Sequence, residues 1–230
     1  MAHGCATCSL KGSPQSCVSI VPIFSALSPD EIAEIAAITT DASYDKGQLM
    51  YFAGKEGNKL YVIHVGKVKI SRIAGNGKSQ VMRVLGPGEF FGELSILGKG
   101  PLSDYAEALE PCSMCMIEGS RLKALMGKYP SIALKVLEEL SLRLSKAESL
   151  IEDISLRSAE RRLALALLEL AKGRREFELP VSKGDLASQL GMTQETFSRK
   201  LSLLQDQGMI LAKGQRGIRI VDEKGLAEVE

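Results

Sequence analysis

The chain has 230 residues, of which 45% are hydrophobic and 25% charged, and its net charge is only +1. This length allows a sizeable core, most naturally divided between two domains. Nothing at the N-terminus resembles a signal peptide, and no segment approaches the roughly 20 apolar residues of a membrane span, so we expect a cytoplasmic protein with no membrane partner.

The cysteines are unevenly distributed, with three in the first twenty residues and two far downstream. They are Cys5, Cys8, Cys17, Cys112 and Cys115. In a reducing compartment, clustered cysteines indicate a metal or redox role rather than a structural disulfide. The segment 1–20 itself shows neither helical nor strand periodicity.

A short helix and then a series of strands follow. Residues 28–31, Ser-Pro-Asp-Glu, are typical of a helix N-terminus with a capping box. From about residue 41 to residue 117, short β-type runs are broken by glycines, as in residues 60–65 and 67–70 on either side of Gly66. Short strands at this spacing predict an antiparallel barrel or a double-sheet roll.

After Pro130 the apolar period becomes helical for nearly thirty residues. The positions step by alternate threes and fours through Leu137, Leu140, Leu144, Ala147, Ile151, Ile154 and Ser158. This is an uninterrupted a/d seam, which favours a parallel dimerisation helix over an ordinary core helix. A second helix is predicted from about Ser158 to Lys172, ending at Gly173.

The C-terminal region is basic and predicts a helix-turn-helix. Residues 157–221 carry 12 Lys/Arg against 7 Asp/Glu, as a phosphate-binding domain needs. A helix capped by Ser182 stops at Gly191, where a tight turn favours a residue that tolerates positive φ. Thr193 then caps the next helix.

One face of this next helix carries side chains suited to reading base pairs. Gln194, Glu195, Ser198 and Arg199 project from the face opposite Phe197. An arginine fork bonds O6 and N7 of guanine, and glutamate accepts from N4 of cytosine. A solvated helix face is the alternative, but a capped helix and a turn glycine precede this pattern.

A β-hairpin is predicted around residues 214–217, Gly-Gln-Arg-Gly, and reads as a wing. Lys213, Arg216 and Arg219 lie on or beside it. We expect these cations to contact the phosphate backbone, which adds affinity but no sequence information.

The order of these features resembles the Crp/Fnr family of bacterial regulators over nearly the whole chain. The resemblance rests on residues 88–94, Gly-Glu-Phe-Phe-Gly-Glu-Leu, on the seam helix, and on residues 193–199, Thr-Gln-Glu-Thr-Phe-Ser-Arg. It implies an α+β chain with four parts. These are a cysteine-rich segment at 1–20, a β jelly-roll sensor domain of the cyclic-nucleotide-binding kind at 21–129, a dimerisation helix at 130–157 and a winged helix-turn-helix DNA-binding domain at 158–230.

The resemblance also implies partners. We expect a homodimer that binds a palindromic double-stranded operator, with half-sites of the TTGAT type as in the Fnr branch, and that works with RNA polymerase. The expected DNA contacts are Thr193, Gln194, Glu195, Ser198, Arg199, Lys213 and Arg216.

For the sensor domain, the resemblance argues against cyclic AMP. Family members that bind it use a Phe-Gly-Glu turn for the ribose and a later Arg-Ser pair for the phosphate. Gly92 and Glu93 are present here, but Leu102 stands where that arginine would be, and Asp104 lies nearby. A cyclic phosphate would lose its bidentate cation. A small molecule in the roll remains an alternative regulator.

The cysteines resemble those of the Fnr branch more closely. Residues 108–115 look like the segment that carries its distal cluster ligand, and Cys115 matches that ligand. Cys5, Cys8 and Cys17 resemble the group that supplies the other three, although the gap before Cys17 is longer than in the best-known pattern. Four thiolates suit a [4Fe–4S] cluster, and a cluster lost to oxygen makes an oxygen sensor. If residues 112–117 form one strand, Cys112 points to the opposite face from Cys115 and is surplus.

Other uses of the cysteines stay open. A thiol–disulfide switch needs no metal, zinc is an option for His3, Cys5, Cys8 and Cys17, and the thiols can also be inert. His64, isolated in a strand, favours a wall residue over a haem ligand. The sequence offers no catalytic triad or catalytic metal motif, so an enzyme is not expected. It predicts a redox- or oxygen-responsive transcription regulator.

Overall fold

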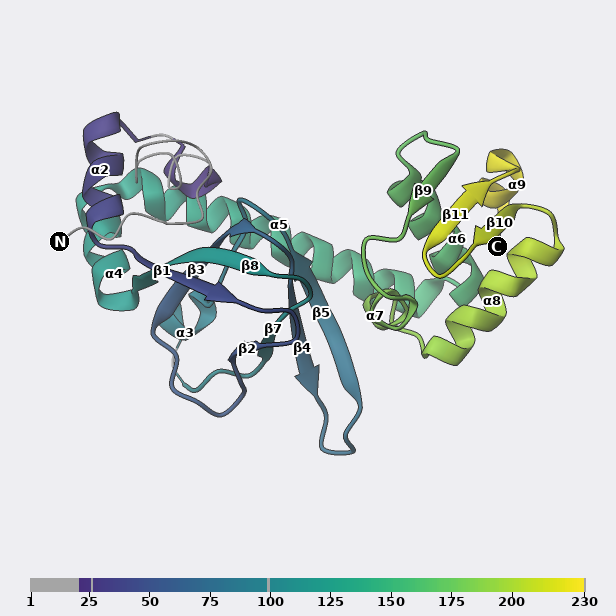
Figure 1. Ribbon diagram of the computed structural model, residues 1–230, viewed down its shortest axis with the longest axis horizontal. Helices are drawn as coiled ribbons and strands as arrows, with labels where there is room; N and C mark the ends of the chain where they lie inside the picture. The colour runs from purple at the N-terminus through teal and green to yellow at the C-terminus, as the bar shows by residue number, and fades with distance from the viewer. Residues whose placement is uncertain (1–20, 26, 99, 230) are drawn as a thin grey trace. The chain divides into compact units, whose positions relative to one another are not determined.

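The computed structural model describes residues 21–25, 27–98 and 100–229, so the N-terminal cysteines lie outside the described residues. The chain divides into two compact units, and the boundary falls inside a long helix, between Leu142 and Arg143. Residues 79–81 group with the second unit. The first unit holds the larger β-structure, and the second holds short helices around a small sheet (Figure 1).

Two four-stranded sheets build the first unit, in the orders β1-β8-β3-β6 and β2-β7-β4-β5. The strands are β1 (Thr40–Tyr44), β2 (Leu49–Tyr51), β3 (Lys59–Val65), β4 (Val68–Ile73), β5 (Ser79–Leu85), β6 (Phe90–Phe91), β7 (Tyr105–Ala108) and β8 (Cys112–Glu118). Neighbours such as β3 and β8 pair antiparallel, which confirms the predicted double-sheet roll. Gly66 separates β3 from β4 with a φ of 93°, and a Cβ there would lie 2.5 Å from the Pro111 carbonyl oxygen.

Strand β3 is buried on both faces, because it separates two hydrophobic cores. Tyr61 and Ile63 face the core between the two sheets. Leu60 and Val62 face a second core, which also contains residues of the neighbouring helices. Those helices are η1 (Pro22–Phe24), α2 (Pro29–Ala37), α4 (Gly119–Lys128) and the start of α5 (Pro130–Leu156), while the short α3 (Glu93–Leu97) follows β6.

Helix α2 begins with the predicted capping box. The Ser28 amide donates to Oε2 of Glu31 at 2.7 Å, and the Glu31 amide donates to Oγ of Ser28 at 3.4 Å. Pro29 occupies the first helical position, where its missing N–H costs nothing.

Helix α5 is the long helix predicted after Pro130 and runs unbroken in Figure 1. Its first turns are anchored by Ile132 and Val136 in the second core of the roll. The predicted seam is wrong at its last position, because Ser158 lies beyond the helix. The hydroxyl of Ser158 accepts from the Arg161 amide at 3.0 Å and caps α6 (Ala159–Ala171). Local capping chemistry therefore ends the heptad pattern.

The second unit holds four short helices and a small sheet. Besides α6, the helices are α7 (Lys183–Gln189), α8 (Gln194–Asp206) and α9 (Glu223–Glu228). The three-stranded sheet has the order β10-β11-β9, built from β9 (Glu176–Glu178), β10 (Ile210–Lys213) and β11 (Gly217–Ile220). Helices α6 and α8 contact this sheet. Among the residues that the structure describes, no helix combines the length and the apolar character that a membrane crossing requires.

Candidate DNA interface and sensor thiols

Helices α7 and α8 form the predicted helix-turn-helix. Oγ of Ser182 accepts from the Asp185 amide at 3.0 Å and caps α7. Oγ1 of Thr193 accepts from the Thr196 amide at 3.1 Å and caps α8, so Thr193 lies at the tip of the second helix. Gly191, at the turn between them, has a φ of 64°.

Helix α8 presents one polar face to solvent. Gln194, Glu195, Ser198 and Arg199 are all accessible on it, whereas Phe197 on the other face is fully buried. Lys200, next to Arg199, is held at 2.9 Å from Glu160 of α6 in an ion pair. The sequence-predicted reading residues therefore share an accessible helix face, with the core on the opposite face.

The turn of the helix-turn-helix has two supports that sequence reasoning missed. Nη1 of Arg162, on α6, donates to the carbonyl oxygens of Leu190 and Gly191. Ile154, near the end of α5, contacts the same turn, because a Cβ added to Gly191 would lie 2.5 Å from its Cδ1. Nothing in the local sequence signals these contacts, since Arg162 is 28 residues from Leu190 and Ile154 is 37 residues from Gly191.

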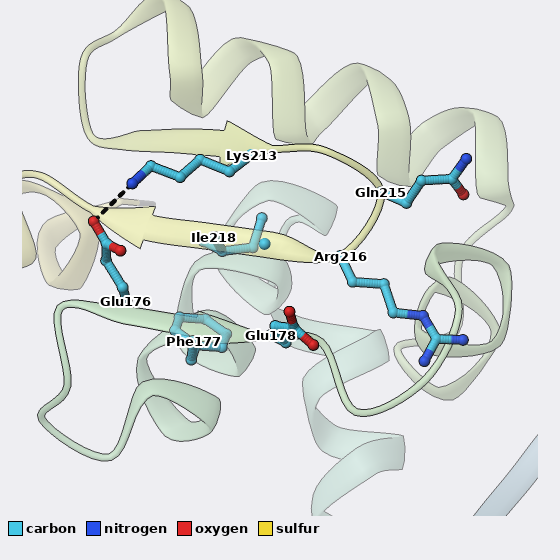
Figure 2. A pocket seen from close by; sticks show the side chains of 8 residues that line it. Glu176, Phe177, Glu178, Lys213, Gln215, Arg216 and Ile218 are labelled. Carbon is cyan, nitrogen blue, oxygen red and sulfur yellow. Dashed lines mark hydrogen bonds and ion pairs between the residues drawn. The ribbon is translucent and has the colours of Figure 1, made fainter.

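The predicted wing is the hairpin of β10 and β11, which β9 extends into a third strand that the sequence did not predict. A shallow groove of about 630 Å³ lies along these strands. In Figure 2 the Lys213 side chain reaches Glu176 of β9, and their Nζ and Oε1 atoms are 2.8 Å apart. Nε of Arg219 lies 3.4 Å from the same carboxylate. Both cations lower the pKa of Glu176, mainly through the Lys213 hydrogen bond.

Arg216 occupies a different part of the wing. It extends from the hairpin end next to Gln215, away from the Lys213–Glu176 pair (Figure 2). Of the three wing cations predicted to contact phosphate, Lys213 and Arg219 therefore already lie beside the Glu176 carboxylate, while the exposed Arg216 points away from it.

The predicted dimer seam on α5 is largely open to solvent. Leu137, Leu144 and Ile151 are 61%, 60% and 66% exposed, and Ala147 is also exposed. Leu140 differs, because it is half-buried against the second core of the roll. A row of large exposed apolar side chains on one helix is typical of an interaction surface.

Strand β8 directs its two cysteines to opposite faces, as predicted. Cys112 belongs to the core between the sheets, and its Sγ lies 3.1 Å from the Glu110 carbonyl oxygen and 3.4 Å from that of Lys67. Burial raises the pKa of the Cys112 thiol. A buried thiol kept protonated is a poor nucleophile and a poor metal ligand.

Cys115 lies on the other face of the same sheet and is 5% exposed. Its Sγ is 2.8 Å from Nε2 of His64 on β3 and 3.4 Å from Oδ1 of Asp41 on β1. Its neighbour across the strand pair is Val62, which shares the second core with Val21. His64 is therefore a buried wall residue, as predicted, but it also contacts a thiol, which the sequence did not signal. Burial lowers the pKa of His64, and the nearby Asp41 opposes this shift.

Within residues 21–229, apart from positions 26 and 99, no cluster of three or more potential metal ligands is found. Cys5, Cys8 and Cys17, predicted as ligands together with Cys115, lie outside the described residues.

The residues that correspond to the cyclic-nucleotide motif make polar contacts within the roll itself. Gly92 has a φ of 89°, and a Cβ there would clash with the Lys59 carbonyl oxygen. The buried Glu93 lies 3.6 Å from Nη1 of Arg83. Leu102 is buried, while Ser103 accepts a hydrogen bond of 3.0 Å from Nη2 of Arg72. Arg72 is thus a cation close to Ser103, which the leucine at position 102 gave no reason to expect.

Comparison with known proteins agrees with this architecture. The family model of the cyclic nucleotide-binding domain matches residues 42–129, and that of the Crp-like helix-turn-helix domain matches residues 161–229. The fumarate and nitrate reduction regulatory protein of Escherichia coli K12 is 32% identical over 191 residues, which are 80% of this chain and 76% of that protein. The cyclic AMP receptor protein of Thermus thermophilus is 30% identical over 189 residues, 82% of this chain and 88% of that one.

A solved structure supports the same fold. FixK2 from Bradyrhizobium japonicum is similar with a TM-score of 0.71 and 28% identity, covering 84% of this chain and 98% of that chain. The chain therefore belongs to the Crp/Fnr family, whose members are DNA-binding transcription regulators and not enzymes.

Proposed function

We propose that this regulator reads TTGAT-type half-sites with the exposed face of α8. Glu195 and Arg199 contact base edges, and Gln194 and Ser198 lie beside them. The observation that carries the proposal is the shared accessibility of these four side chains on a helix whose opposite face is buried. Arg199 suits a guanine and Glu195 a cytosine, so one G·C pair can engage both.

The proposed operator is palindromic, because a two-fold symmetric dimer presents two copies of α8. The proposed dimer contact is the seam of α5, formed by Leu137, Leu140, Leu144, Ala147, Ile151 and Ile154. The exposed apolar residues of this seam support it.

RNA polymerase is the proposed protein partner, by resemblance to the family. Selection of binding sites from random DNA, followed by footprinting, tests the operator; an asymmetric or sequence-independent footprint contradicts it.

For the signal, we propose a [4Fe–4S] cluster held by Cys5, Cys8, Cys17 and Cys115. Cys115 fits this role because it offers a sulfur on the helix-covered face of the roll. Val21, which follows Cys17 by four residues, is buried in the core on that same face. Cys112 does not fit, because it faces the interior between the sheets. The cluster, when bound, supplies sensitivity to oxygen, and its loss changes the sensor domain.

The test is anaerobic reconstitution with iron and sulfide, read by absorption and by iron and sulfide analysis. We expect about four irons per chain in the wild type and in Cys112→Ser, and loss of the cluster in Cys115→Ser. A colourless wild-type protein without iron contradicts the cluster. In that case, DNA affinity measured on oxidised and reduced protein tests the alternative, a thiol–disulfide switch involving Cys115.

A cyclic nucleotide is the second candidate ligand, and one contact favours it. Arg72 donates to Ser103, so a guanidinium lies beside the residue that follows Leu102. Calorimetry with cyclic AMP and cyclic GMP decides the matter. Micromolar binding that Arg72→Ala abolishes would establish this ligand. We expect no binding, because Leu102 supplies no cation and Arg72 already donates to Ser103.

A further inference from the structure

Among the residues that the structure describes, one ring nitrogen of His64 has a hydrogen-bond partner and the other has none. Nε2 lies 2.8 Å from Sγ of Cys115, whereas Nδ1 is buried with no hydrogen-bond partner among the described residues. His64 is only 9% exposed, and a buried imidazole with one unpartnered nitrogen is best accommodated as the neutral ring with a single N–H. A buried N–H without an acceptor is rarer and costlier than a buried acceptor without a donor. The proton therefore belongs on Nε2, where it points at the sulfur.

We propose that His64 is a positioning residue that donates an N–H···S hydrogen bond to Cys115 and so orients and tunes this sulfur. For its metal readout the proposal rests on the cluster proposed above, while the hydrogen bond itself does not. Hydrogen bonds to ligand sulfurs set cluster potentials. Partners of this kind, one shell out from the metal, are worth about 10- to 100-fold in metal affinity or activity.

Asp41 faces the same sulfur from the opposite neighbouring strand, β1. In the thiol form the S–H donates to Oδ1 of Asp41 across 3.4 Å. In a ligating thiolate this proton is gone, and the carboxylate then faces a negative sulfur. His64 and Asp41 therefore act in opposite directions: the N–H stabilises negative charge on sulfur, and the carboxylate destabilises it.

The hydrogen bond is tested first without metal. The chain has only two histidines, His3 and His64, so His3→Gln leaves a single imidazole. Long-range proton–nitrogen correlation spectra of this apo-protein should show the Nε2–H tautomer, with signals that shift in Cys115→Ser. The Nδ1–H tautomer would overturn the proposal.

The tuning is tested on the reconstituted protein with matched variants. His64→Phe removes the donor and keeps a flat ring, and His64→Gln keeps an N–H at a similar reach. We expect His64→Phe to lower the midpoint potential and to lose the cluster to oxygen or chelator about 10-fold faster, with His64→Gln close to the wild type. Asp41→Asn should move the potential upward. A folded His64→Phe with unchanged potential and unchanged cluster loss contradicts the proposal.

If the wild type binds no iron, the proposed cluster function fails, and the hydrogen bond is then tested through the reactivity of the Cys115 thiol. Alkylation of the native protein with iodoacetamide, read residue by residue by mass spectrometry, should be slower at Cys115 in His64→Phe than in the wild type or His64→Gln. Cys112, on the other face of the strand, should react equally in all three. Equal rates at Cys115 would refute the proposal independently of any metal.

Discussion

Ile154, in the last turn of α5, packs against Gly191 at the turn of the helix-turn-helix. At the other end of the same helix, Ile132 is buried in the core of the roll. Because α5 is one continuous helix, the element proposed for dimerisation also contacts the turn of the helix-turn-helix directly. A substitution or displacement at the C-terminal end of α5 therefore alters the packing of the turn at Gly191.

This contact makes Gly191→Ala a strongly unfavourable substitution. The φ of 64° costs an alanine about 1–2 kcal/mol, and its Cβ would lie 2.5 Å from Cδ1 of Ile154, which adds about 1–3 kcal/mol of overpacking. Gly208→Ala is the matched control, with a φ of 73° and nothing within 4 Å. Urea unfolding should show a larger loss for Gly191→Ala, and Ile154→Ala should recover part of it in the double variant. Equal losses of stability in the two glycine variants would show that the contact with Ile154 adds nothing to the cost of Gly191→Ala.

Local signals in the sequence predicted the elements that position α8. The caps at Ser182 and Thr193 and the turn at Gly191 each depend on a few neighbouring residues, so their chemistry is visible in the sequence. Ser158 shows the limit of the heptad pattern, because its own capping of α6 overrides the period.

The missed features all join residues far apart in the chain. Glu176 lies 37 residues from Lys213, and His64 lies 51 residues from Cys115. Their proximity depends on strand order, which no local pattern encodes. Three-residue β9 is too short for a clear alternation, and so the carboxylate that engages Lys213 was not expected.

Truncation of Arg199 and truncation of Arg216 should weaken DNA binding in different ways. Arg199→Ala should cost about 1–3 kcal/mol on the preferred operator and relax discrimination at one G·C pair. Arg216→Ala should weaken binding to every sequence about equally and reduce the slope of log affinity against log salt by about 1. Titrations of each variant on operator and scrambled DNA at several salt concentrations measure both effects. A uniform loss with Arg199→Ala would assign that residue to the phosphates.

Glu176→Gln should strengthen DNA binding. The carboxylate holds Lys213 at 2.8 Å and lies 3.4 Å from Arg219, so it competes with phosphate for both cations. Removing it should raise affinity on operator and scrambled DNA alike and steepen the salt dependence by about 1. Glu178→Gln removes the same charge two residues along β9 and is the control. If both variants behave alike, only net charge matters and the specific pair has no role.

Cys112 should contribute to a loss of stability in alkali. Burial raises the pKa of its thiol, so the folded state holds the proton more tightly than the unfolded state. The resulting stabilisation is complete below the unfolded pKa of about 8.5 and is lost as pH rises through the folded value. Cys112→Ala lacks this contribution, and its free energy of unfolding should decline less between about pH 8 and 10. Urea titrations across that range compare the two proteins, and parallel profiles contradict the prediction.

Ile151→Glu should break the dimer without unfolding the chain. Ile151 is 66% exposed on the proposed seam, so a charge there costs little in one chain and is buried only on association. Two such carboxylates facing each other should weaken dimerisation by about 3 kcal/mol or more, which is a factor of roughly 100 in the dissociation constant. Leu142→Glu is the matched control, since Leu142 is 59% exposed on the same helix but off the seam. Sedimentation equilibrium should give monomers for Ile151→Glu and dimers for Leu142→Glu. The reverse pattern would move the interface to the face of α5 that carries Leu142.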